Sequence, residues 1–146
     1  MPNAGDPFFA SDYNALVGPW TPYDAAWNAA TNPAINNGVK GGYVKTIGEL
    51  VLFTYELTFG STTNPGAGTW LFTLPVIPAA RVSPGWVFNA HALDAGGNKY
   101  VLGCELDNVN RVRLFNPGTP NMVGPTVPFT WAVGDVLRLG GQYEPA

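Results

Sequence analysis

Apolar and polar residues alternate along most of the chain from Gly41 onward. The clearest stretch covers residues 49–59, where every second side chain is large and apolar: Val51, Phe53, Tyr55, Leu57 and Phe59. The residues between them are mostly Thr and Glu. A period of two predicts an antiparallel strand with one buried face and one exposed face.

The same alternation recurs at short intervals. It predicts further strands at residues 69–74, 86–93, 98–106, 110–115, 127–132 and 135–143. Residues 94–97 read Asp-Ala-Gly-Gly and predict a hairpin turn, and residues 60–68 are rich in turn formers. About eight strands at this spacing predict an all-β fold, an antiparallel β-sandwich or jelly roll.

The first 37 residues have a different character, being dominated by Pro, Ala, Asn and aromatic residues. Residues 10–16 predict one or two helical turns with Ser11 as the N-cap. Residues 18–23 are expected to be extended, because their prolines fix φ and restrict the preceding residue. We therefore expect an extended N-terminal arm over residues 1–37 and a β-sandwich domain over residues 38–146.

Large aromatic side chains are concentrated in this arm: Phe8, Phe9, Tyr13, Trp20, Tyr23 and Trp27. Each ring removes about 150–250 Å² from water when it is buried, and an arm of this kind cannot build its own core. The rings are expected to pack on the sandwich or on a neighbouring subunit, which makes the arm a candidate anchor or inter-subunit strap. A sugar-stacking platform is the alternative interpretation of the same residue types.

Composition narrows the function classes. Apolar residues make up 46% of the 146 residues and charged residues only 12%, about half the charged share of an average soluble domain. This favours a surface that is partly covered by other subunits. The net charge of −3 without a basic cluster argues against nucleic-acid binding. No apolar run reaches membrane-spanning length and no signal-peptide pattern is present, so we expect synthesis in a cytoplasm and no membrane insertion.

Residue types that carry chemistry are few. His91 is the only histidine, so a multi-ligand metal site is not predicted. Cys104 alternates with apolar residues and is expected in the core. A cysteine nucleophile would need His91 as its base, and the predicted hairpin could bring the two close together. Glu105 and Asp107 lie two apart on a strand and leave a glycosidase-like carboxylate pair conceivable, although such spacing is common by chance.

The remaining candidate motifs favour turns. Asp94 and Asp135 sit where Asp commonly bonds the local backbone. The glycines at 66–68 and 96–97 do not lead into a helix and are not followed by a phosphate-binding lysine. No catalytic, metal-binding or cofactor-binding residue is therefore assigned, and the chain is expected not to be an enzyme.

Several short motifs, taken in order, resemble a module of tailed-bacteriophage virion surface proteins. They are residues 20–23 (WTPY), 31–38 (TNPAINNG), 42–48 (GYVKTIG), 59–63 (FGSTT), 68–75 (GTWLFTLP), 128–135 (PFTWAVGD) and 140–144 (GGQYE). Residues 10–16 (ASDYNAL) also resemble the start of phage tail-fibre and appendage proteins. One departure is Asn36-Asn37-Gly38, where the pattern usually has Gly-Asn-Gly.

The resemblance implies a β-sandwich that assembles as a homotrimer on the virion surface, with phage capsid or tail proteins as partners. It implies a non-enzymatic structural protein, either a capsid decoration (head-fibre) protein or a tail-fibre-like appendage, made in the host cytoplasm. The chain has no repetitive shaft, so its length fits the decoration protein slightly better. The alternative is a carbohydrate-binding, receptor-recognition module of a phage tail that contacts a host-surface glycan.

Overall fold

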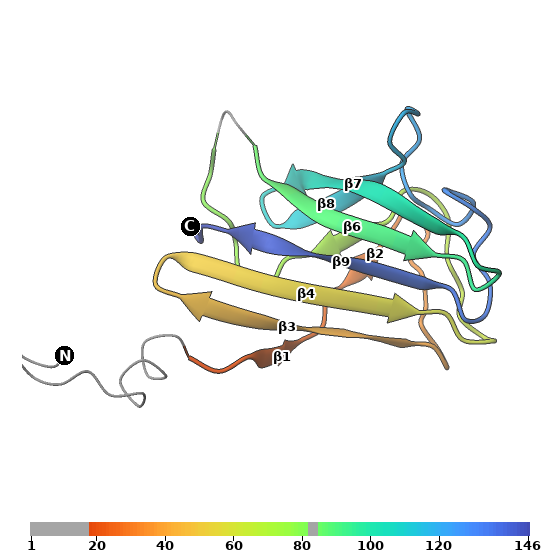
Figure 1. The fold of residues 1–146 in the computed structure, drawn as a ribbon, viewed down its shortest axis with the longest axis horizontal. Helices are drawn as coiled ribbons and strands as arrows, with labels where there is room; N and C mark the ends of the chain where they lie inside the picture. The colour runs from red at the N-terminus through yellow and green to blue at the C-terminus, as the bar shows by residue number, and fades with distance from the viewer. Residues whose placement is uncertain (1–17, 82–84) are drawn as a thin grey trace, which may run out of the picture.

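The structure is a computed structural model that describes residues 18–81 and 85–146 (Figure 1). These residues form strands and loops and contain no helix. The predicted helical turn at residues 10–16 lies outside the described residues. The strands are β1 (Thr21–Tyr23), β2 (Trp27–Asn28), β3 (Val39–Ile47), β4 (Leu50–Thr58), β5 (Leu71–Thr73), β6 (Val87–Leu93), β7 (Lys99–Asn108), β8 (Arg111–Phe115) and β9 (Val136–Tyr143).

All described strands belong to one antiparallel sheet of nine strands in the order β1-β3-β4-β9-β6-β7-β8-β5-β2. The last strand, β9, lies between β4 and β6 and joins the two halves of the sheet. The predicted all-β antiparallel fold is confirmed. The predicted sandwich or jelly roll is not confirmed, because all nine strands are hydrogen-bonded into one continuous sheet. A period of two shows which face is buried but not whether the packed layers are separate sheets.

The two edge strands, β1 and β2, are separated in the chain by residues 24–26 alone. The chain from Tyr23 to Trp27 spans at most about 14 Å when fully extended. Nine strands laid flat would be about 38 Å wide. The sheet must therefore curl until the start of β2 comes within that distance of the end of β1, and Figure 1 shows β2 behind β9.

Hydrogen bonds attach the end of β1 and the connection that follows it to β5, the neighbour of the other edge strand. The Tyr23 hydroxyl donates to the Thr73 carbonyl oxygen at 2.6 Å, and the Ala26 amide donates to Thr73 Oγ1 at 2.8 Å. The Thr73 amide in turn donates to the Ala26 carbonyl oxygen at 3.2 Å. Lys40 Nζ, on β3, holds the Asp24 carboxylate at 2.5 Å. The segment between β1 and β2 is thus bonded to strands near both edges.

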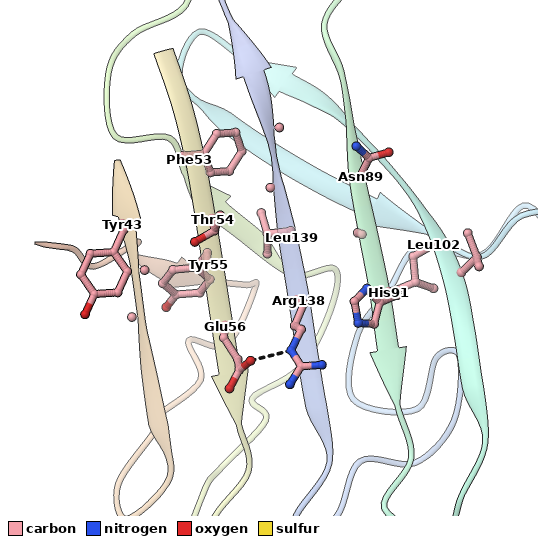
Figure 2. Close-up of a pocket in the computed structure, with 16 residues that line it drawn as sticks. Tyr43, Phe53, Thr54, Tyr55, Glu56, Asn89, His91, Leu102, Arg138 and Leu139 are labelled. Carbon is pink, nitrogen blue, oxygen red and sulfur yellow. Dashed lines mark hydrogen bonds and ion pairs between the residues drawn. The ribbon is translucent and has the colours of Figure 1, made fainter. Parts of the chain in front are cut away.

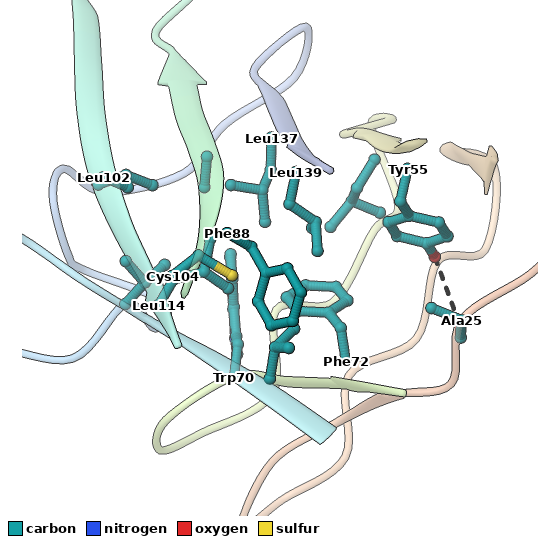
Figure 3. Close-up of a cluster of buried hydrophobic side chains, with 14 of the residues drawn as sticks. Ala25, Tyr55, Trp70, Phe72, Phe88, Leu102, Cys104, Leu114, Leu137 and Leu139 are labelled. Carbon is teal, nitrogen blue, oxygen red and sulfur yellow. Dashed lines mark hydrogen bonds between the residues drawn. The ribbon is translucent and has the colours of Figure 1, made fainter. Parts of the chain in front are cut away.

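The hydrophobic core fills the inside of the curled sheet (Figure 3). The alternation predicted for residues 51–59 is confirmed, because all five apolar side chains of that series are buried. Aromatic rings meet across the core: Trp27 lies 5.0 Å from Trp70 between ring centroids and 6.3 Å from Phe72. The Tyr55 ring lies 5.8 Å from Phe72, which connects opposite walls of the curled sheet.

The described part of the predicted arm, residues 18–37, is integrated into this domain, since it supplies both edge strands. Trp27 is only 6% exposed and Tyr23 packs against the core. Phe8, Phe9 and Tyr13 lie outside the described residues. A role of the arm's aromatic residues in anchoring or assembly stays a prediction, but Tyr23 and Trp27 make their contacts within their own chain.

Two local expectations differ from the structure. Residues 127–132 do not form a strand, because Pro128 lacks the N–H that a strand needs, and Trp131 is instead buried against Phe59 at 5.2 Å between ring centroids. At the departure from the usual Gly-Asn-Gly pattern, Asn36 has a φ of 48°. Asn enters this left-handed region more readily than other residues with a Cβ, so the turn can form without Gly.

We expect Trp27→Ala to lower the free energy of unfolding by about 3–5 kcal/mol, because it empties a large aromatic site in the core. Trp27→Phe should cost less, since the buried indole nitrogen has no hydrogen-bond partner in the described part of the chain. Urea denaturation followed by circular dichroism measures both. Trp20→Ala, at a position 46% exposed, is the control. Equal losses for Trp20→Ala and Trp27→Ala would contradict this placement of Trp27.

Candidate binding groove on the outer face of the sheet

The outer face of the sheet, opposite the core, presents two neighbouring rows of residues that cross the strands. Strand register places one row in the order Tyr43, Thr54, Gly140, Asn89 and Gly103. The adjacent row reads Gly41, Glu56, Arg138, His91 and Val101. Residues from β3, β4, β9, β6 and β7 therefore meet on one surface.

An open groove of about 840 Å³ follows these rows (Figure 2). Gly140 places no side chain on the floor of the groove. A larger residue would not fit there, because a Cβ at this position would lie 2.7 Å from the Phe53 carbonyl oxygen. At the β7 end, the Phe115 ring lies over Gly103, where a Cβ would lie 2.0 Å from the ring. Gly140, in β9 at the centre of the sheet, therefore leaves the space that the groove occupies.

One wall of the groove carries an ion pair between neighbouring strands. Arg138 Nε on β9 donates to Glu56 Oε2 on β4 at 2.5 Å (Figure 2). Both side chains are about half exposed, so the pair adds little to stability. Its effect is to hold a guanidinium and a carboxylate in fixed positions beside the groove.

Two exposed aromatic residues adjoin one end of the groove. Tyr43 is 55% exposed and Trp20 is 46% exposed. Together with Thr54 they line an apolar hollow of about 310 Å³. Tyr43 and Thr54 also line the groove, so the hollow lies directly beside the groove.

Several polar side chains of the groove are available for contacts with another molecule. Thr54, Asn89 and His91 make no side-chain hydrogen bond to residues 18–81 or 85–146. The guanidinium of Arg138 uses only Nε within the same residues. These groups supply both donors and acceptors.

A Cys104 nucleophile would need His91 as its base, but the two residues lie on opposite faces of the sheet. His91 is exposed on the outer face and Cys104 is completely buried in the core. Burial, with a smaller contribution from the negative charge of Glu105, raises the pKa of the Cys104 thiol to about 12. The thiol therefore stays protonated at neutral pH, and the core position predicted for Cys104 is confirmed.

Glu105 and Asp107, the conceivable carboxylate pair, are bound by arginines on β8. Arg113 Nε donates to Glu105 Oε1 at 2.9 Å, and Arg113 Nη1 donates to Asp107 Oδ1 at 3.3 Å. Arg111 also contacts the Asp107 carboxylate, at 3.6 Å. The two carboxylates thus belong to an ion-pair cluster that links β7 and β8.

Asp94 and Asp135 occupy turns, as predicted. The Gly96 amide donates to Asp94 Oδ1 at 2.8 Å. Asp135 accepts hydrogen bonds from the Ala132 amide at 2.5 Å and from the Ala95 amide at 2.8 Å, which ties the start of β9 to the β6–β7 hairpin. Among the described residues there is neither a cluster of three potential metal ligands nor a helix that could cross a membrane.

The sequence singled out only part of this groove. The sequence pattern points to Trp20, as part of the aromatic arm, and to His91, as the lone histidine, whereas no pattern points to Tyr43, Asn89 or Arg138. The alternation of β4, β6 and β9 does place Glu56, Asn89 and Arg138 on the exposed face. What the sequence lacks is the strand order that brings β3, β4, β9 and β6 together.

A comparison with curated proteins shows a phage-related similarity. The chain is 30% identical over 116 residues to a protein named "Mu-like prophage FluMu defective tail fiber protein" from Haemophilus influenzae. The match covers 77% of this chain but only 18% of that protein. No protein-family model matches the chain, and neither does any solved structure.

We expect stability to fall at alkaline pH. The Cys104 thiol ionises near 9.0 in the unfolded chain but only near pH 12 in the fold, so its contribution is complete below pH 9 and is lost as pH rises toward 12. Burial also raises the pKa of Tyr143, to about 12, and adds to the loss above pH 10.

The urea midpoint at pH 7, 9 and 10.5 measures this effect, and Cys104→Ala is the matched variant. The variant should lose less stability than the natural chain between pH 9 and 10.5. Identical pH profiles for the two proteins would show that Cys104 is accessible to solvent in the folded state.

Proposed function

We propose that this chain is a non-enzymatic structural module of a bacteriophage tail appendage, exposed on the virion surface and assembled as a homotrimer. The observation that carries the proposal is the similarity to a protein named as a tail fibre over 77% of this chain. The same observation favours a tail appendage over a capsid decoration protein, the other role that the motifs imply.

The fold supports a modular role. The hydrophobic core is enclosed by the strands of a single curled sheet, and the similarity to the tail-fibre relative covers 77% of the chain. A domain of this kind can be joined to other segments of a longer appendage through its ends. The module accounts for 18% of the length of its tail-fibre relative.

We infer that the first part of the arm mediates assembly with neighbouring subunits or tail proteins. Because Tyr23 and Trp27 pack in the core of their own chain, Phe8, Phe9 and Tyr13 are the remaining arm aromatics for contacts with neighbouring subunits or tail proteins. Trp20 lies at the rim of the outer-face groove and is assigned to ligand contact instead. A second function, carbohydrate recognition on a host surface, is favoured by the composition of that groove.

Replacing Phe8, Phe9 and Tyr13 together by Ala should dissociate the trimer, because it removes the apolar side chains that join subunits while leaving the described core unchanged. Sedimentation equilibrium measures the mass, which should fall from three times the 15.5 kDa chain mass to that of one chain.

The control is a triple Ala variant at exposed apolar positions elsewhere, Val39, Val109 and Val133. A natural chain that sediments as a monomer would contradict the trimer. Electron microscopy of particles carrying a labelled copy tests the location: label on the tail supports the proposal, and label on the capsid overturns it.

A further inference from the structure

We propose that the outer-face groove binds a neutral oligosaccharide, with Trp20 and Tyr43 stacking on a sugar ring and the polar side chains of the groove bonding its hydroxyl groups. The proposal adds a ligand to the tail-appendage role, and it can fail while that role stands.

The aromatic end of the groove matches the apolar side of a sugar. A pyranose ring exposes patches of C–H groups on its faces and hydroxyl groups around its rim. Exposed Trp and Tyr rings offer flat apolar surfaces with a polar tip, which suits a ligand that is itself part apolar and part polar. Trp20 and Tyr43 share a hollow beside the groove, and no described side chain covers either ring completely.

The polar part of the groove matches the rim of a sugar. A hydroxyl group both donates and accepts, so it is best bound by neighbouring groups of both kinds. The Asn89 amide provides two donors and an acceptor, and the pair formed by Arg138 and Glu56 places guanidinium donors beside a carboxylate acceptor. Thr54 and His91 add groups that are not used within the described protein.

The charge of the groove favours a neutral ligand. Among the described residues that line it, the formally charged side chains are Glu56 and Arg138, which neutralise each other across the β4–β9 pair. An anionic polymer would need an excess of basic side chains along its path. The described lining offers none, so an uncharged saccharide fits better than a nucleic acid or a sulfated polymer.

The dimensions favour several sugar units over one. From Tyr43 on β3 to His91 on β6 the groove crosses three strand spacings, about 14 Å. Its volume of about 840 Å³ falls in the range typical of ligand sites. Because the groove is open to solvent, binding by one chain should be weak, and simultaneous binding by linked copies would strengthen it.

A second copy of the chain is the competing occupant of this face. Interfaces between permanent subunits have apolar, well-packed centres. The centre of this face instead consists of Gly140, Asn89 and the ion pair, while the exposed valines of this face lie toward its β7 side: Val101 lines the β7 end of the groove and Val87 is on β6 outside its lining. The composition therefore favours a polar ligand over a subunit interface.

The test uses the full chain on an array of neutral bacterial surface oligosaccharides, followed by calorimetry with the strongest binder. We expect Trp20→Ala and Tyr43→Ala each to weaken binding by about tenfold or more, and Asn89→Ala to weaken it by about tenfold. Arg138→Ala should also weaken binding. Its matched control is Arg81→Ala, which removes another exposed arginine, ion-paired to Glu144, outside the groove.

Three results would overturn the inference. A folded chain that binds no oligosaccharide on the array has no such site. Binding that survives both Tyr43→Ala and Asn89→Ala takes place elsewhere on the protein. If Trp20→Ala or Tyr43→Ala lowers the sedimenting mass, the face is an interface between copies. The tail-appendage proposal is tested separately by the Phe8, Phe9 and Tyr13 substitutions.

Discussion

The segment formed by residues 24–26 carries the chain from one edge of the nine-stranded sheet to the other. This short connection forces the sheet to curl, and the hydrogen bond from the Tyr23 hydroxyl on β1 to the Thr73 carbonyl oxygen on β5 joins its two ends. Curling encloses the aromatic core, which no flat sheet of this chain could do with one layer. The contact of Lys40 with Asp24 attaches the connection to β3. The Tyr55 hydroxyl, 3.4 Å from the Ala25 carbonyl oxygen, attaches it to β4 (Figure 3).

The same constraint decides which surface is left for function. Since the inner face of the sheet is buried in the core, contacts with other molecules must use the outer face, the loops or the chain ends. The pairing of β1 with β3 places Trp20, just before β1, beside Tyr43 at the edge of the outer face. The edge strand β1, from which the short connection leads to β2, therefore also positions the exposed aromatic end of the groove.

The sequence predicted the burial pattern of individual strands well. The alternation around Phe53 and Tyr55, the β6–β7 hairpin and the core position of Cys104 all follow from local period and turn residues. It did not predict the strand order, because β9 pairs with β4 and β6 through contacts far apart in the chain. For the same reason the sequence left open whether Trp27 packs on its own domain or on a neighbouring subunit, and it did not indicate that Tyr43 lines a groove. The strand predicted at residues 127–132 was wrong, because the apolar character of these residues suggested a strand although Pro128 has no N–H for strand pairing.

Hydrogen exchange where the connection between β1 and β2 joins β5 tests the account most directly. The amides of Ala26 and Thr73 both donate hydrogen bonds there, although they belong to a three-residue connection and to a short strand. If the connection is held to β5 as described, both amides should exchange as slowly as those of β4 and β9, with an opening free energy equal to that of global unfolding. Fast exchange at both amides, while β4 and β9 stay protected, would show that the connection is detached from β5 and would contradict the account.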